Sequence, residues 1–157
     1  MSVRTRGYAH RVDIVAPPSR VWSALIEPAL LARWFGPNPS VKPKAGGRFQ
    51  ATLDPGLERE ALIDIFDVNR RLRLVYMTPS YLPPFEGAVV DDFLIEPEGP
   101  NTIVRLLGSG IPEGKLWDAH YVKLRAQSER ALARLKLLME KKVAPPSIGP
   151  GAASGTA

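Results

Sequence analysis

The feature that most constrains the fold is residues 115–142, which the sequence predicts to be one uninterrupted amphipathic helix. No proline occurs there before Pro145, and the residues outside one apolar stripe are mostly Arg, Lys, Glu and Gln. At a rise of about 1.5 Å per residue the helix is about 40 Å long, enough to cross a whole sheet. The stripe, at 3- and 4-residue steps, consists of Trp117, Tyr121, Leu124, Ala131, Leu135 and Leu138.

The rest of the chain supplies a sheet on which this stripe can pack. Residues 8–15 predict a first strand, and from residue 40 onward short segments rich in β-branched and aromatic residues alternate with turn motifs such as "KAGG", "DPG" and "EPEGPN". This pattern indicates an antiparallel meander of about six strands, counting the first. The "GSG" at 108–110 is interpreted as one more turn.

Two short helices are predicted between the first strand and the meander. "APPS" ends the strand, "SRVWSALI" has helical spacing, and Pro28 suits the first turn of a second helix, "PALLARWF". The two helices form a bent clamp. We expect Trp34 and Phe35 to lie where this clamp meets the sheet.

A sheet and one long helix combine when the sheet curls and the helix lies across its concave face. A curved sheet and a straight helix separate at some point along their length, so we expect an apolar hollow between them, bordered by Trp34. The C-terminal half of the helix is aliphatic, whereas its N-terminal half carries Trp117, His120 and Tyr121. Aromatic side chains with polar ends suit the boundary between apolar and wet surroundings, so the mouth is expected at the N-terminal half.

The segment "LPPFEGAVV" interrupts the strands and carries Phe85. It reads as a loop, and loops of this kind often cover binding sites. A lid over the hollow and an apolar plug over the sheet edge are both open interpretations.

Charged residues inside the predicted strands have two interpretations. Alternation places Asp91 on the same face as Phe93, which would put its carboxylate inside the hollow or at its rim. Asp64 and Arg105 are expected on the solvated face, where charges discourage edge pairing. An acid/base pair of Asp91 and His120 could cyclise a polyketide, and the sequence permits this without singling it out.

The composition excludes several kinds of chemistry. There is no cysteine, and the two histidines have no partner at ligand spacing, so no metal site is expected. No nucleophile elbow, phosphate loop or dinucleotide motif occurs, so we expect no catalytic residue and no cofactor.

The net charge of +5 comes from dispersed basic residues, so the sequence predicts a solvated surface and no nucleic-acid partner. No apolar run approaches the roughly 20 residues of a membrane helix, so no membrane insertion is expected. A cytoplasmic location is the default expectation.

Four motifs resemble one known family. "VDIVAPPSRVWSAL" resembles the opening of the START-like superfamily, also called SRPBCC. "EPALLARWFGP", "KPKAGGRFQ" and "ERALARLKLLME" are similar to its branch of homologues of the activator of the heat-shock protein 90 ATPase. The resemblance extends from about residue 8 to residue 142.

The resemblance implies an α+β helix-grip fold. In this fold a curved antiparallel sheet, here of about six or seven strands, wraps around one long C-terminal helix, with two short helices after strand 1. It also implies a deep hydrophobic cavity. Members of the superfamily bind lipids, hormones, polyketides or other apolar ligands, and a few are cyclases or hydrolases.

We therefore predict a START-like ligand-binding domain over residues 1–143 and a disordered Pro/Gly/Ala-rich tail over residues 144–157. The expected function is binding of a hydrophobic small molecule, lipid-like or aromatic, without catalysis. A polyketide cyclase or aromatase on the same scaffold and a co-chaperone-like interaction module are the alternatives. The oligomeric state is left open, with a homodimer as one outcome. The predicted ligand-binding residues are Trp34, Phe49, Tyr76, Tyr81, Phe85, Asp91, Phe93, Trp117, His120 and Tyr121.

Overall fold

The computed structural model describes residues 3–141, so the predicted tail, residues 144–157, lies outside the described residues. The chain forms strands and helices in the following order: β1 (Thr5–Ile14), α1 (Pro18–Ile26), α2 (Pro28–Trp34), β2 (Ser40–Val41), β3 (Arg48–Leu53), β4 (Leu57–Asp67), β5 (Arg71–Tyr76), β6 (Val89–Glu98), β7 (Asn101–Pro112) and α3 (Lys115–Glu140).

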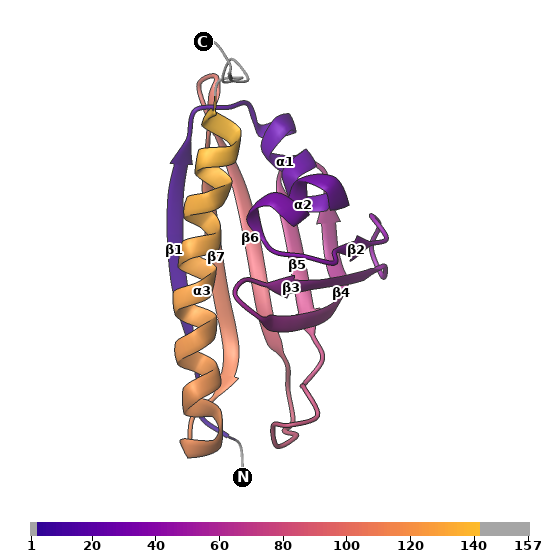
Figure 1. Cartoon of the computed structure of the whole chain (residues 1–157), viewed down its shortest axis with the longest axis vertical. Coiled ribbons are helices and arrows are strands. Elements are labelled where there is room, and N and C mark those ends of the chain that lie inside the picture. The colour runs from indigo at the N-terminus through magenta and orange to yellow at the C-terminus, as the bar shows by residue number, and fades with distance from the viewer. Residues whose placement is uncertain (1–2, 142–157) are drawn as a thin grey trace, which may run out of the picture.

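The strands form one seven-stranded antiparallel sheet in the order β1-β7-β6-β5-β4-β3-β2. The sheet curves around α3, which contacts β1, β3 and β7 and reaches both short helices. Figure 1 shows α3 running along β1 and β7 while the β3–β4 hairpin curls toward its middle. The predicted α+β helix-grip fold is therefore confirmed. No helix in residues 3–141 has the length and apolar character needed to cross a membrane.

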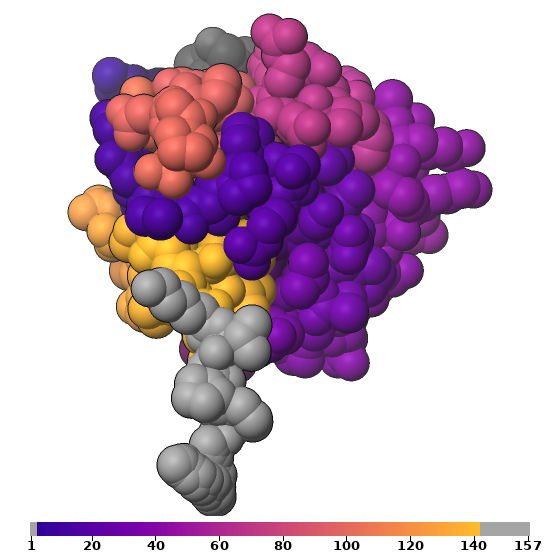
Figure 2. Space-filling view, turned by 90° about the horizontal axis from the view of Figure 1, so that it is seen from above, coloured from indigo at the N-terminus to yellow at the C-terminus, as the bar shows by residue number. Residues whose placement is uncertain are grey.

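Prolines set the bend between the two short helices. Pro18 and Pro28 each occupy the first turn of a helix, where a missing N–H is tolerated. Glu27 ends α1 and precedes α2 in extended conformation, so the chain turns at one residue. Seen from above in Figure 2, these helices, the end of α3 and the β6–β7 turn pack together at one end of the molecule.

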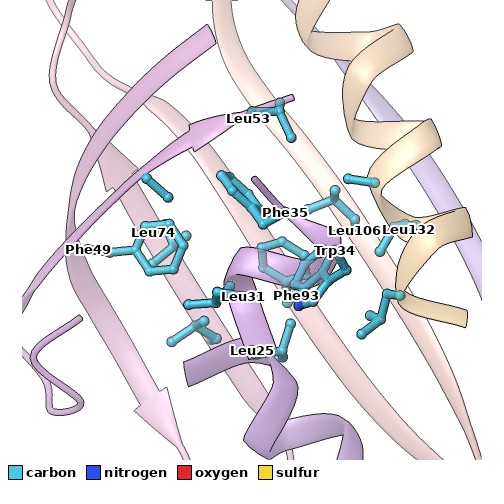
Figure 3. Packing of buried hydrophobic residues seen from close by; sticks show 14 of the residues in the cluster. Leu25, Leu31, Trp34, Phe35, Phe49, Leu53, Leu74, Phe93, Leu106 and Leu132 are labelled. Atoms are coloured by element: carbon cyan, nitrogen blue, oxygen red, sulfur yellow. The ribbon is translucent and has the colours of Figure 1, made fainter. Parts of the chain in front are cut away.

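Trp34 fills the space at this end. Its side chain is 2% exposed, and its indole N–H donates to the carbonyl of Ala24 at 2.7 Å. Its ring meets the rings of Phe35 and Phe93 edge to face, with centroids 5.6 and 6.4 Å apart. Figure 3 shows these rings meeting among leucines from the helices and the sheet. From α3, Arg134 Nε donates to the carbonyl of Trp34 at 2.8 Å and so fixes the end of α2 to the long helix.

The interpretation of residues 108–110 as a turn is wrong, because they lie within β7. Gly108 pairs with Tyr8 on one side and Asp91 on the other. A Cβ at Gly108 would lie 2.3 Å from Cζ of Tyr8, so the ring of Tyr8 can cross β7 only because this position has no side chain. Glycine within a strand here marks a close approach.

We predict that Gly108→Ala lowers the free energy of unfolding by ~1–3 kcal/mol, because the new methyl group displaces the Tyr8 ring. Chemical denaturation measures this change. Gly56→Ala is the matched control, since a Cβ at Gly56 meets nothing within 4 Å. Equal stability of the two variants would contradict the packing described for Gly108.

Candidate functional site

Away from the end that Trp34 fills, polar side chains from five elements meet on the concave side of the sheet. They come from β1, β4, β5, β6 and α3, with one residue from each element. The group consists of Tyr8, Arg59, Tyr76, Asp91 and Ser128.

Asp91 is the centre of this group and is 2% exposed. The hydroxyl of Tyr8 donates to its Oδ1 at 2.6 Å, and the hydroxyl of Tyr76 donates to its Oδ2 at 3.0 Å. Each oxygen of this buried carboxylate therefore has a hydrogen-bond donor. Burial, together with the charge of Asp91, raises the pKa of Tyr8, and burial raises the pKa of Tyr76, so both phenols stay protonated and able to donate.

Arg59 supplies the balancing positive charge. It is 5% exposed, and its Nη1 lies 3.6 Å from Oδ2 of Asp91, an ion pair that is too long for a good hydrogen bond. Its guanidinium lies 3.5 Å over the ring of Tyr76. Burial acts to lower the pKa of Arg59, but its interactions with Tyr76, Asp91 and Tyr8 together outweigh burial, so the pKa is raised and the group stays charged.

The helix side of the site is aromatic. His120 is 7% exposed, and its ring meets those of Trp117 and Tyr81 at centroid distances of 5.5 and 6.2 Å. Phe85 in turn meets Trp117 edge to face at 5.3 Å. Burial, followed by the positive charges of Arg59 and Lys123, lowers the pKa of His120 to about 4, so its ring is neutral at pH 7.

Two cavities meet at Arg59. An open pocket of about 570 Å³ lies between the β3–β4 hairpin, residues 50–52 and 58–60, and the segment 77–81. Deeper in, a void of about 10 Å³ has Arg59, Tyr76, Trp117 and His120 in its wall. Residues 58–60, which are Glu58, Arg59 and Glu60, and residues 77–79 belong to both walls, so they separate the open pocket from the interior. A shallower pocket of about 240 Å³ lies beside Phe85 and Trp117.

The structure brings part of the predicted set together. Tyr76, Trp117 and His120 surround the void, Tyr81 lines the open pocket, and Phe85 lies against Trp117. Asp91 lies inside the fold, where both of its oxygens accept from tyrosines.

Other predicted residues lie elsewhere. Trp34, Phe49 and Phe93 belong to the packed core and line none of these three cavities. The hollow expected beside Trp34 is not among these three cavities, and interlocking aromatic rings pack around Trp34 and Phe35. Tyr121 faces β1, where its hydroxyl donates to the carbonyl of Gly7 at 2.9 Å.

The Asp91–His120 acid/base pair that the sequence permits has no hydrogen bond within residues 3–141. Asp64 and Arg105 lie on the outer face as expected, since the side chain of Asp64 is 54% exposed and Arg105 pairs with Glu96 at 2.8 Å. No cluster of three or more potential metal ligands occurs in the described part of the chain.

Sequence reasoning missed Tyr8, Arg59, Gln127 and Ser128. Arg59 carried a readable signal, because Leu57, Ala61 and Ile63 alternate with it in register and all point inward. Gln127 and Ser128 interrupt the apolar stripe of α3, and Ser128 donates to the hydroxyl oxygen of Tyr8 at 3.5 Å.

We predict that Asp91→Ala lowers the free energy of unfolding by ~3–5 kcal/mol, because it leaves the charge of Arg59 buried without its partner. Asp64→Ala is the control and should change stability by less than ~0.5 kcal/mol, as expected for an exposed position. Urea denaturation of both variants measures the difference. A small effect at Asp91 would mean that the buried charges do not depend on each other.

We predict that His120 makes the protein less stable in acid. Its pKa is lowered from 6.5 to about 4 in the fold, so the unfolded chain binds its proton more readily and stability falls as the pH drops from 6.5 toward 4. In His120→Phe this part of the loss should vanish. Unfolding measured in steps from pH 7.5 to pH 4 tests this, and parallel curves for the two proteins would contradict it.

The match to a family model covers most of the chain. The model described as "Activator of Hsp90 ATPase homolog 1-like protein" matches residues 15–140. No curated protein matches the sequence.

Solved structures share the fold at low sequence identity. Protein MLL2253 from Mesorhizobium loti has a TM-score of 0.74 at 22% identity, over 87% of this chain and 98% of that one. The Aha1 dimer from Colwellia psychrerythraea has a TM-score of 0.71 at 18% identity, over 87% of this chain and 97% of that one. CalU16 from Micromonospora echinospora has a TM-score of 0.67 at 21% identity, over 92% of this chain and 84% of that one. With its helix-grip fold and the matched model, the chain belongs to the Activator of Hsp90 ATPase homolog 1-like family within the START-like, or SRPBCC, superfamily.

Proposed function

We propose that the protein binds a hydrophobic small molecule, lipid-like or aromatic, between the sheet and the N-terminal half of α3, and that it does so without catalysis. The observation that carries this proposal is the change of the interior along α3. The clamp end is packed with aliphatic and aromatic side chains, whereas the other end has an open pocket and a void that share the wall formed by residues 58–60 and 77–79.

The dimensions of the open pocket support this function. Its volume of about 570 Å³ falls within the range of about 300–1,000 Å³ that small-molecule sites occupy. Tyr81 offers aromatic surface in the wall of this pocket, and Trp117 on α3 offers it in the wall of the adjoining void. Each well-buried aromatic contact contributes on the order of 1.5–3 kcal/mol.

The loop of residues 77–88 controls access to the interior in this proposal. It contains no strand or helix, and two aromatic pairs join it to α3, Tyr81 with His120 and Phe85 with Trp117. A ligand that enlarges the void would replace these contacts with its own. Of the two interpretations of Phe85, the proposal therefore takes the lid.

Binding fits the site better than the alternative of a cyclase or aromatase. That chemistry needs an acid or base that can reach a ligand carbonyl. Both oxygens of Asp91 accept hydrogen bonds from tyrosines, and burial lowers the pKa of His120 to about 4. Neither residue is therefore placed to act as the general base that a cyclase requires at pH 7.

Self-association is a separate part of the proposal. The Aha1 protein from Colwellia psychrerythraea was solved as a dimer, which makes a homodimer the state we expect here too.

We predict that at least one member of a panel of fatty acids, fatty alcohols and polycyclic aromatic compounds raises the melting temperature and binds in calorimetry. Tyr81→Ala should weaken that binding about tenfold, because about 1.5 kcal/mol of aromatic contact is lost. Leu137→Ala is the matched control, since Leu137 is 69% exposed against 67% for Tyr81 but lies far along α3. If no compound of the panel binds, the proposal is wrong. If Tyr81→Ala and Leu137→Ala lose the same affinity, the ligand does not bind at Tyr81.

A further inference from the structure

The guanidinium of Arg59 has hydrogen-bonding capacity that the fold does not use. Its Nη1 is buried and has no hydrogen-bond partner among residues 3–141. A guanidinium has five N–H donors, and a buried donor without a partner is costly, so such a group calls for an explanation.

Asp91 does not provide this partner, although it is the nearest carboxylate. Its oxygens accept from the hydroxyls of Tyr8 and Tyr76 at 2.6 and 3.0 Å, whereas Nη1 of Arg59 lies 3.6 Å from Oδ2, in ion-pair contact but beyond hydrogen-bond distance. The two phenols thus donate to Asp91 the pair of hydrogen bonds that an arginine often donates to a buried carboxylate. The charge of Arg59 is balanced at a distance, and its N–H group remains available.

Arg59 is also placed where a ligand would meet it. It lies in the walls of both the open pocket and the deeper void. The face of its guanidinium lies on the ring of Tyr76, which leaves the edge with its N–H donors for other contacts. The adjacent acids, Glu58 and Glu60, also line both cavities, but they alternate with Arg59 along β4, and Glu60 pairs with Arg48.

We propose that Arg59 binds a carboxylate at the inner end of the ligand, so that the preferred ligand is an apolar molecule carrying an acid group, with its apolar body against Trp117 and Tyr81. This inference rests on the proposed function and names the class of ligand. The planar edge of a guanidinium matches the two oxygens of a carboxylate, and such charge-assisted bonds are the stronger kind. The hydrogen bonds from Tyr8 and Tyr76 disperse the negative charge of Asp91, which would otherwise repel the carboxylate of the ligand.

The test compares ligands that share an apolar body and differ only in the head group. Decanoate is paired with 1-decanol and 2-naphthoate with 2-naphthalenemethanol, and each is titrated into the full chain by calorimetry at pH 7. We expect the acid of a pair to bind about tenfold or more tightly than its alcohol. In Arg59→Met this preference should fall to near one, while the affinity for the alcohol changes less than about threefold.

Arg105→Met is the matched control, because Arg105 lies in the same sheet but pairs with Glu96 on the outer face. It should keep the wild-type preference. If Arg59→Met does not fold by circular dichroism, the double variant Arg59→Met/Asp91→Asn removes both buried charges and decides the question in its place.

The outcomes separate the two proposals. Equal affinity for acid and alcohol in the wild type, or a preference that survives in the Arg59 variant, overturns the role of Arg59 and leaves ligand binding intact. An equal loss of preference in Arg105→Met assigns the effect to overall charge and also overturns it. If no member of either pair binds while other apolar compounds of the panel do, only the acid class is wrong. If nothing binds, the proposed function fails, and the role of Arg59 with it.

Discussion

The packing of a straight helix into a curved sheet is the constraint on which the rest of this structure depends. Along the C-terminal half of α3, leucines meet Trp34 and Phe35 from the clamp, and Arg134 ties the end of α2 to the helix. This contact buries the apolar surface of the sheet at one end. At the other end, the same geometry brings polar side chains from both layers together without closing the space around Arg59.

The buried carboxylate of Asp91 organises that second end. It joins β1, β5 and β6 through two tyrosine hydroxyls, and Gly108 provides the gap through which the ring of Tyr8 reaches it. A neutral His120 and a charged Arg59 then face the same interior from opposite layers. One face of the site is thus a fixed polar network, and the other consists of aromatic contacts that involve the loop of residues 77–88.

The architecture could be predicted from the sequence because its signals are local. The stripe of α3, the prolines of the clamp and the turn motifs each act within a few residues. The site could be predicted only in part. Strand alternation correctly placed Asp91 inward, but whether Trp34 borders a hollow or fills it depends on sheet curvature and ring packing, which join residues far apart in the chain. Arg59 escaped notice because an arginine is ordinarily assigned to the surface.

The pairing of β1 has a consequence for how the chain assembles as it is made. The neighbours of this first strand are the last strand, β7, and the last helix, α3. Contacts of such long sequence separation form late and slow the search for the native state. During synthesis, β1 must therefore wait until β7 and α3 have left the ribosome, and until then Tyr8 cannot reach Asp91 across β7.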